Sequence, residues 1–120
     1  MPEDNTYKLY RQGLELLEDG NFDEATVPLA EVARRAPEKT SVREALGRAY
    51  FRNRQFAEAA AEFEAVVESH PVDDYAHFCL GRSLANTGRT AEARRHAALA
   101  ANMRPDRKDY QAFSRRLRAA

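Results

Sequence analysis

The side chains that could carry out catalysis or hold a metal are few in this sequence, and their spacing suits neither role. The histidines are His70, His77 and His96, and Cys79 is the lone thiol. Residues two apart, such as His77 and Cys79, point to different sides of a helix. A metal site needs ligands at helical or Cys-x-x-Cys spacing. The sequence also lacks a glycine-rich phosphate loop and a Gly-x-Ser-x-Gly nucleophile motif. It therefore predicts no enzyme activity, no cofactor and no metal site.

Arginine is the side chain whose spacing best suits binding. Arg48, Arg82 and Arg116 recur at a 34-residue interval, and a guanidinium can grip a carboxylate with two parallel hydrogen bonds. The formal net charge is zero, but residues 1–74 carry 16 acidic and 9 basic side chains, a net of −7, and residues 75–120 carry 3 and 10, a net of +7. This asymmetry could attract an anionic partner or pair two copies head to tail. A coding bias is the alternative explanation, because arginine outnumbers lysine 16 to 3.

The 34-residue interval extends to other residue types, which indicates an internal repeat. The residues that align are Gly13, Gly47 and Gly81, then Ala25, Ala59 and Ala93, then Pro37, Pro71 and Pro105. The pattern resembles the tetratricopeptide repeat (TPR), whose unit reads W-x2-L-G-x2-Y, then A-x3-F, then P. The middle repeat matches it with Leu46, Gly47, Tyr50, Ala59, Phe63 and Pro71, and has Arg43 at the tryptophan position.

Each repeat is expected to hold two helices. Apolar residues recur at helical spacing in both halves of the unit, tight turns are expected at residues 20–21 and 87–90, and the three repeated prolines end the second helices. Residues 107–120 read as a further helix that closes the stack as a cap. The resemblance predicts an all-α fold, a right-handed superhelical solenoid within one domain over residues 1–120. Its repeats are 6–39, 40–73 and 74–107, and its capping helix is 108–120.

Several local features lead to narrower expectations. Asn21 and Ser41 each precede a glutamate by three residues, which predicts capping boxes at two helix starts. Pro28 falls inside the second helix of repeat one, where a kink or a late helix start is expected.

The histidines have structural interpretations. His70 is expected near a helix C-terminus, where the dipole favours a cation. His77 is expected at a packing position, and His96 either faces solvent or lines a seam between helices.

The resemblance also implies a binding surface. TPR solenoids bind along their concave face, which the second, fifth, ninth, twelfth and thirteenth positions of each first helix line. Counted from residues 6, 40 and 74, the candidate peptide-binding residues are Tyr7, Tyr10, Leu14, Glu44, Arg48, Phe51, Arg52, Tyr75, Phe78, Arg82 and Asn86, with Arg116 from the capping helix. Aromatic and arginine side chains are typical of binding hot spots. These residues favour a protein- or peptide-binding adaptor whose partner segment is acidic and apolar, although some of the aromatics could belong to the core.

One TPR subclass holds the acidic tail of heat-shock chaperones in a carboxylate clamp of lysine, asparagine and arginine. The corresponding residues here are Tyr10, Leu14, Ala45, Tyr75 and Cys79. The clamp is absent, so a chaperone tail held in that way is not an expected partner.

Two other functions stay open. The basic C-terminal half could bind nucleic acid or another polyanion, which the neutral overall charge and scarce lysine make less favoured. The chain could also self-associate as a structural module. No segment approaches the roughly 18 apolar residues of a membrane helix, so no membrane insertion is expected. A single cysteine fits a reducing compartment, and the expected setting is the bacterial cytoplasm.

Overall fold

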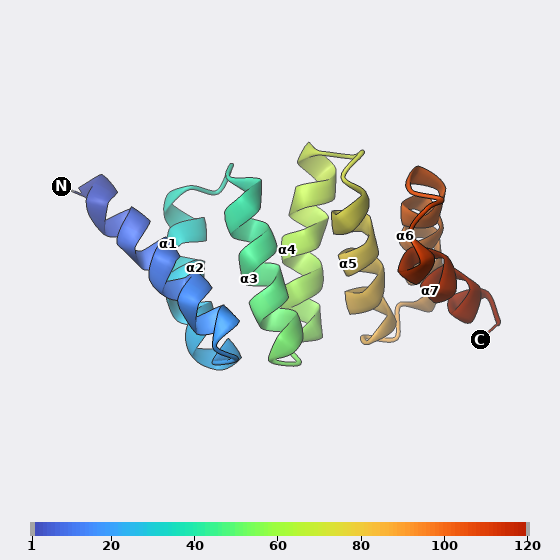
Figure 1. Cartoon of the computed structure of the whole chain (residues 1–120), viewed down its shortest axis with the longest axis horizontal. Coiled ribbons are helices and arrows are strands. Elements are labelled where there is room, and N and C mark those ends of the chain that lie inside the picture. The colour runs from blue at the N-terminus through green and yellow to red at the C-terminus, as the bar shows by residue number, and fades with distance from the viewer. Residues whose placement is uncertain (1, 120) are drawn as a thin grey trace.

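The computed structural model describes the backbone of residues 2–119 and the side chains of residues 5–119. Every regular element in that part is a helix (Figure 1). The helices are α1 (Pro2–Glu18), α2 (Phe22–Arg35), α3 (Thr40–Arg52), α4 (Phe56–Ser69), α5 (Asp74–Ala85), α6 (Thr90–Met103) and α7 (Lys108–Ala119). None of the described helices is both long and apolar enough to cross a membrane.

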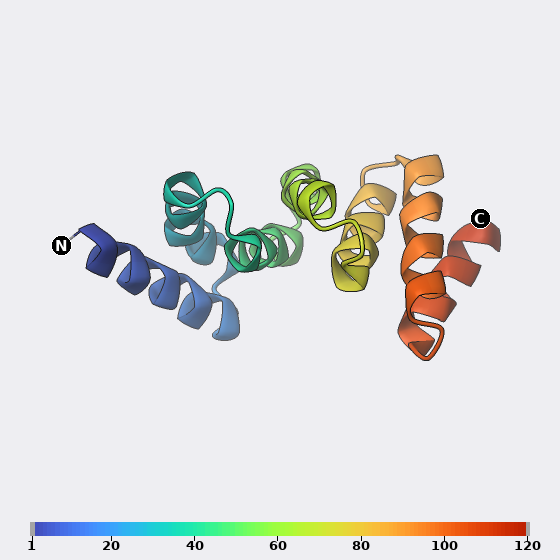
Figure 2. The same cartoon turned by 90° about the horizontal axis from the view of Figure 1, so that it is seen from above.

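The helices form an elongated stack. Each helix packs against the next along the chain, and α1 also touches α3, which is the nearest-neighbour packing of a solenoid. The molecule measures 51 × 25 × 23 Å. Its radius of gyration of 14.7 Å exceeds the roughly 13.6 Å of a compact domain of this length. Figure 2 shows the stack running along the long axis, with the two termini at opposite ends. The predicted all-α solenoid of helix pairs is confirmed.

The repeated glycines allow the two helices of a pair to approach closely. A Cβ on Gly47 of α3 would lie 2.8 Å from the ring of Phe63 on α4, and one on Gly13 would lie 2.5 Å from Cγ of Leu29 on α2. Real Cβ atoms do not come this close to a neighbour, so a larger residue at either position would push the helices apart.

In the third pair, the large side chain that packs against the glycine comes from the next helix of the chain. Leu29 and Phe63 have Ala97 as their equivalent 34 residues on, and alanine is too small to cover Gly81. The ring of Phe113 on α7 covers it instead, 3.2 Å from where a Cβ on Gly81 would stand. In repeat three, therefore, the capping helix supplies the bulky side chain that the second helix supplies in the other two repeats.

The turn inside each pair has one backbone geometry. Gly20, Arg54 and Gly88 are 34 residues apart, and their φ angles are 84°, 64° and 80°, all in the left-handed region. The residue after each donates a backbone hydrogen bond to a carbonyl five residues earlier, as Gln55 N does to Tyr50 O at 2.8 Å. This is the Schellman closure of a helix C-terminus. The sequence pattern predicted the first and third turns but not Arg54.

The predicted capping boxes are wrong. Helix α3 begins at Thr40 with Lys39 as its N-cap, so Ser41 already lies inside the helix. Asn21 does precede α2, but its side chain makes no capping hydrogen bond. Among the cap residues of α2 to α6, the one whose side chain caps is Asp73, where Oδ1 accepts from Ala76 N at 3.0 Å.

The late start predicted at Pro28 is also wrong, because α2 begins at Phe22 and continues through the proline. Pro28 is buried.

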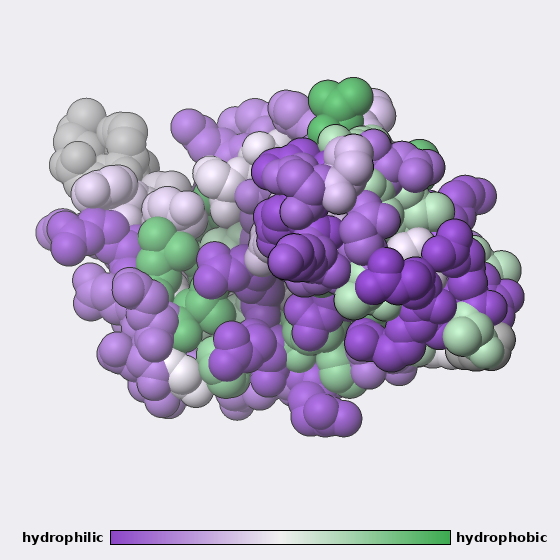
Figure 3. Space-filling model, turned by 45° about the vertical axis from the view of Figure 1, so that its right-hand side comes forward, coloured by the Kyte–Doolittle hydropathy of each residue, from purple (hydrophilic) through white to green (hydrophobic). Residues whose placement is uncertain are grey.

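Helix α7 packs as an integral cap. Tyr110 is fully buried, its ring stacks on Phe78 with centroids 4.6 Å apart, and its hydroxyl donates to Asp74 Oδ2 at 2.8 Å. Arg94 Nε of α6 donates to the carbonyl of Leu117 at 2.9 Å. Hydrophilic side chains cover most of the face seen when the C-terminal end is turned forward (Figure 3). These features support the predicted role of a cap.

Candidate peptide-binding groove

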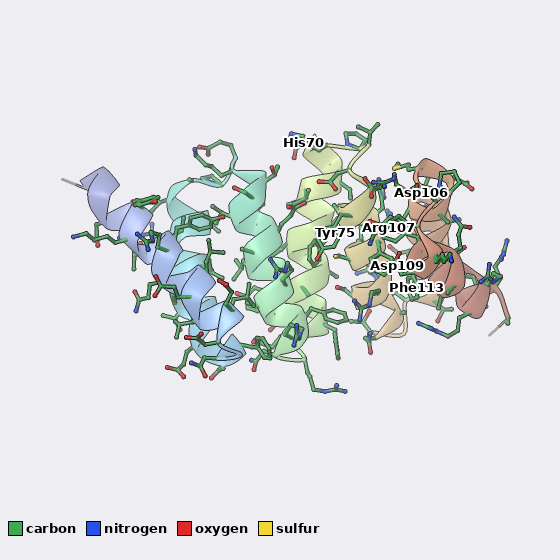
Figure 4. The ribbon with its side chains drawn as sticks, in the orientation of Figure 1. His70, Tyr75, Asp106, Arg107, Asp109 and Phe113 are labelled. Carbon is green, nitrogen blue, oxygen red and sulfur yellow. The ribbon has the colours of Figure 1, made fainter. Side chains whose placement is uncertain are left out.

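A pocket of about 140 Å³ is lined mainly by residues of α3 and α5, with one residue each from α1 and α4. Its walls hold both charged and aromatic side chains. They are Leu17, Arg48, Phe51, Arg52, Phe63, Tyr75, Cys79 and Arg82. In Figure 4, Tyr75 lies on the side of α5 that faces α3 and α4, while Phe113 and Asp109 belong to the capping helix at the other side.

Side-chain size explains why the pocket forms at this junction. Phe63 and Cys79 both line it, and the small thiol leaves space above the ring. One repeat later, the equivalent of Cys79 is Phe113, which packs against Phe78 with ring centroids 5.5 Å apart. The equivalent space between α5 and α7 is therefore occupied by an aromatic ring.

Two of the three guanidinium groups of the pocket, those of Arg52 and Arg82, stack on aromatic rings. Cζ of Arg82 lies 4.6 Å from the ring centroid of Phe51 and 5.6 Å from that of Phe78. Cζ of Arg52 lies 4.5 Å from the ring centroid of Phe22. Such contacts orient the cation without neutralising it.

The arginines of the pocket have no carboxylate partner among the described side chains. Among the described side chains, Arg48, Arg52 and Arg82 form no ion pair within 4 Å. Seven arginines outside the pocket pair with a carboxylate, namely Arg11, Arg34, Arg35, Arg43, Arg89, Arg104 and Arg107, whereas Arg54, Arg95, Arg115, Arg116 and Arg118 also form no ion pair among the described side chains. The pocket therefore presents cationic groups whose hydrogen-bond donors can engage an anion.

Two neutral donors complete the wall. Burial raises the pKa of Tyr75 to about 12, and the neighbouring Cys79 adds to the shift. Burial likewise raises the pKa of the Cys79 thiol to about 12. Both groups stay protonated at neutral pH, so the charge of the pocket comes from its guanidiniums.

Glu44 lies at the edge of this region. Burial raises its pKa to about 7, and a hydrogen bond with the Asp73 carboxyl and the charge of that group add to the shift. Arg48, one helical turn further on, opposes the shift. Near neutral pH a large share of Glu44 is protonated, so its carboxylate does not fully balance the charge of Arg48.

The remaining candidate residues occupy different surroundings. Tyr7 and Tyr10 line a second hollow with Ser41 and Val42, nearer the N-terminus. Asn86 lines a shallow hollow that borders the pocket at Phe51, Arg52 and Arg82.

Three candidates pack against the protein itself. Leu14 is half-buried against the N-terminal core, and Phe78 lies against the rings of Tyr110 and Phe113. Arg116 is on α7 with Cζ 5.6 Å from the ring centroid of Phe113, and it does not line the pocket.

Two pocket residues lie outside the face that the sequence predicted, whereas Leu17 occupies the twelfth position of its first helix, on that face. Phe63 comes from a second helix, and Cys79 stands one position after a groove-lining position. The sequence does contain a signal for these two residues. Repeat two combines a large Phe63 with a small Cys79, whereas the equivalent positions one repeat later hold a small Ala97 and a large Phe113. The described part of the chain contains no group of three or more His, Cys, Asp or Glu side chains placed to hold a metal ion.

Comparisons with solved structures show the same architecture. The first TPR of Spaghetti (RPAP3), bound to the HSP90 peptide SRMEEVD, is 18% identical and superposes with a TM-score of 0.87, over 97% of this chain and 92% of that one. MamA from Desulfovibrio magneticus RS-1 is 21% identical, with a TM-score of 0.91 over 98% of this chain and 67% of that one. MamA from MSR-1 is 25% identical, with a TM-score of 0.84; this chain is covered over 92% and spans only 64% of that one.

No curated protein matches the sequence. The family comparison gives a direct assignment, because residues 10–54 and 44–110 match the tetratricopeptide repeat. These segments cover most of the chain and include all three aligned glycines. The chain therefore belongs to the tetratricopeptide repeat family.

Proposed function

We propose that this protein is an adaptor that holds an extended segment of another protein against α3 and α5. The segment carries an acidic side chain next to an apolar one. The acidic group binds between Arg48 and Arg82, and the apolar group packs on Phe51 and Tyr75. The setting that we propose is the bacterial cytoplasm.

The observation that carries this proposal is that arginines without a carboxylate partner gather with aromatic rings in one pocket. The guanidinium of Arg82 stacks on the ring of Phe51, and neither Arg82 nor Arg48 has a carboxylate partner among the described side chains, so both can form a charge-assisted hydrogen bond. Phe51 and Tyr75 add apolar area beside them, and this combination is typical of interface hot spots.

A similar fold holds an acidic peptide in the Spaghetti TPR, whose bound peptide is SRMEEVD. In the present chain the residues of the carboxylate clamp are replaced by Tyr10, Leu14, Ala45, Tyr75 and Cys79. The proposed grip therefore uses other positions, and a free chaperone tail is not the proposed partner.

Binding of labelled short peptides by fluorescence anisotropy tests the proposal. One peptide set combines glutamate with aromatic or aliphatic residues, and a matched set has lysine in place of each glutamate. The natural chain should bind the acidic set. The double variant Arg48→Ala/Arg82→Ala should lose at least about 100-fold in affinity, because each charge-assisted contact contributes about 1.5–3 kcal/mol.

The matched control is Arg115→Ala/Arg118→Ala, which removes two exposed charges from α7. Arg94 is unsuitable as a control because it holds the end of α7. Equal weakening by both double variants would mean diffuse electrostatic attraction and would remove the support for the groove. Binding of a random oligonucleotide that falls steeply with salt and needs Arg115 and Arg118 would favour the polyanion function. An apparent molar mass from light scattering that rises with protein concentration would favour self-association.

A further inference from the structure

The helices of the second repeat are joined by a polar contact at the tryptophan position of the TPR pattern. Arg43 of α3 donates from Nε to the carbonyl of Pro37 at 2.8 Å, and from its Nη1 to Glu62 Oε1 of α4 at 2.9 Å. We call this set of contacts the clasp. It ties the first helix of the repeat to both the preceding turn and the second helix.

The third repeat builds the clasp from two histidines, 34 residues further on. His77 Nε2 lies 2.8 Å from the carbonyl of Pro71, and His77 Nδ1 lies 2.9 Å from His96 Nδ1 of α6. The rings are nearly parallel, with centroids 5.2 Å apart. Both residues are buried, with exposures of 5% and 9%. In the first repeat the equivalent residues are Leu9 and Pro28, which cannot form a polar clasp.

The hydrogen bonds determine where the protons lie. A carbonyl oxygen only accepts, so His77 Nε2 must carry the hydrogen. The Nδ1 of a neutral His77 is then bare and accepts from His96 Nδ1–H. The intact clasp therefore consists of two neutral imidazoles that share one hydrogen between their Nδ1 atoms.

Protons disrupt this arrangement in two steps. The first proton charges a buried ring, which costs free energy. The second places hydrogens on both Nδ1 atoms, which lie only 2.9 Å apart, so the hydrogen bond is lost and two cations face each other. Arginine stays charged over this range, and a carboxylate is ordinarily ionised above about pH 5, so an arginine–glutamate clasp is held where a histidine pair is not.

We propose that His77 and His96 form a proton-sensitive clasp, through which mild acid weakens the packing of α5 on α6 while the Arg43–Glu62 clasp still joins α3 to α4. The third repeat is thereby the acid-labile unit of the solenoid.

The charges around the pair reinforce this behaviour. Burial lowers the pKa of His96 to about 4, and the charges of His77 and of Arg95 on α6 lower it further, while Glu92 on α6 opposes them. Arg89 holds Glu92 in an ion pair at 2.7 Å. The folded-state pKa lies below the ordinary value of 6.5. The stability from neutral His96 is therefore complete above about pH 6.5 and is lost as the pH falls toward 4.

The other elements near the pair contribute groups that are already engaged. On α5, Asp74 lies one turn before His77 and accepts from the hydroxyl of Tyr110 of α7. In the turn before α7, Arg104 pairs with Asp106 at 2.8 Å. At the end of α4, the Nδ1 of His70 lies 3.1 Å from the Ser69 hydroxyl, at the surface.

One consequence concerns binding and rests on the proposed function. Helix α5 carries Tyr75, Cys79 and Arg82 of the pocket. Weaker packing of α5 on α6 would let this wall shift, so acid would also weaken the binding of a peptide. The clasp itself does not depend on whether the groove binds a peptide.

The test exchanges one clasp for the other. The variant His77→Arg/His96→Glu places the clasp of repeat two in repeat three. Urea unfolding of the full chain is measured at about pH 7.5 and about pH 5, on either side of the ordinary histidine range. The acid-induced drop in the urea midpoint should be at most about half as large in this variant as in the natural chain. The reciprocal variant Arg43→His/Glu62→His should show a larger drop. An equal drop in all three chains would overturn the proposal.

A second measurement serves if the exchange variant fails to fold. The ring C–H signals of His96 in the natural chain are followed by NMR as the pH falls. They should shift below the ordinary histidine range, together with loss of α5–α6 amide signals before those of α3–α4. A shift of the His96 signals within the ordinary range, or loss of α3–α4 signals first, would contradict the proposal. Peptide binding is assayed separately at neutral pH, so failure of the groove and failure of the clasp are distinguishable.

Discussion

Arg54 ends the turn after α3 with φ at 64°, a conformation that the equivalent Gly20 and Gly88 adopt without a side chain. The left-handed region costs a residue with a Cβ about 1–2 kcal/mol. The cation–π contact of the guanidinium with the ring of Phe56, with Cζ 5.3 Å from the centroid, offsets part of this cost. The turn is therefore strained at one of its three occurrences.

Replacing this arginine should stabilise the protein. We expect Arg54→Gly to raise the free energy of unfolding by about 0.5–1 kcal/mol, after subtraction of the cation–π contact. Urea unfolding measures the change. Ala61→Gly, at an exposed position inside α4, is the control and should lower stability by about 1 kcal/mol. A loss of stability in both variants would show that the turn is not strained.

Glu44 predicts a second effect at the scale of one residue. Its folded-state pKa of about 7 lies above the ordinary 4.5. Its stabilising contribution is therefore complete below about pH 4.5 and is lost as the pH rises through about 7. Glu44→Gln keeps the hydrogen bond to Asp73 and cannot ionise, so its melting temperature should exceed that of the natural chain at about pH 8 and match it at about pH 5. Glu64→Gln, on an exposed side chain of α4, serves as the control. A Glu44→Gln chain that melts at the natural temperature at the higher pH would contradict the shift.

At the scale of elements, the exchange of large and small side chains sets how each pair meets the next. Phe63 on α4 faces Gly47, and Phe113 on α7 faces Gly81. Because Ala97 is small, α7 supplies a contact that α4 makes within its own repeat. The cap is therefore part of the core of repeat three.

This exchange can be tested by reversing it. Phe113→Ala alone should cost about 3–5 kcal/mol, because it empties a buried site. Ala97→Phe alone should cost about 1–3 kcal/mol through overpacking. The double variant should be more stable than the sum of these losses by about 0.5–3 kcal/mol, since the new ring fills the space of the old one. Additive losses in urea unfolding would mean that the two sites do not share one space.

At the scale of the whole molecule, the stack has a closed C-terminal end. Helix α7 covers Phe78, Gly81 and the small residues of α6, and turns its arginines outward. Figure 3 shows the hydrophilic surface that results. Without α7, this apolar end would be left for another molecule to cover.

Removing residues 109–120 should therefore lower the melting temperature and increase association. We expect light scattering of the truncated chain to grow with concentration more steeply than that of the full chain. The control is Arg115→Ala/Arg118→Ala, which changes the outer face of α7 and leaves its packing intact. A truncated chain with an unchanged melting temperature and unchanged scattering would show that α7 is not a cap.

The sequence by itself determined the local and periodic features of the protein. Glycine, alanine and proline at 34-residue spacing predicted three helix pairs and their turns, because turn geometry and helix ends depend on neighbouring residues. The amphipathic pattern after Pro105 predicted α7 for the same reason. Two local rules failed: Asn21 and Ser41 do not cap a helix with their side chains, and α2 continues through the buried Pro28.

Only the tertiary structure decided which side chains meet across the stack. His77 and His96 are 19 residues apart and lie on different helices, so helical periodicity does not predict that they meet. The packing of α5 on α6 nevertheless brings their Nδ1 atoms to 2.9 Å. The same holds for the pocket, where the floor comes from Phe63 of a second helix and the space from the small Cys79. Arg116 continues the arginine spacing but lies outside the pocket, because Phe113 fills the equivalent space. Periodicity predicts the face on which a residue lies, whereas the volume of its neighbours decides whether that face is open.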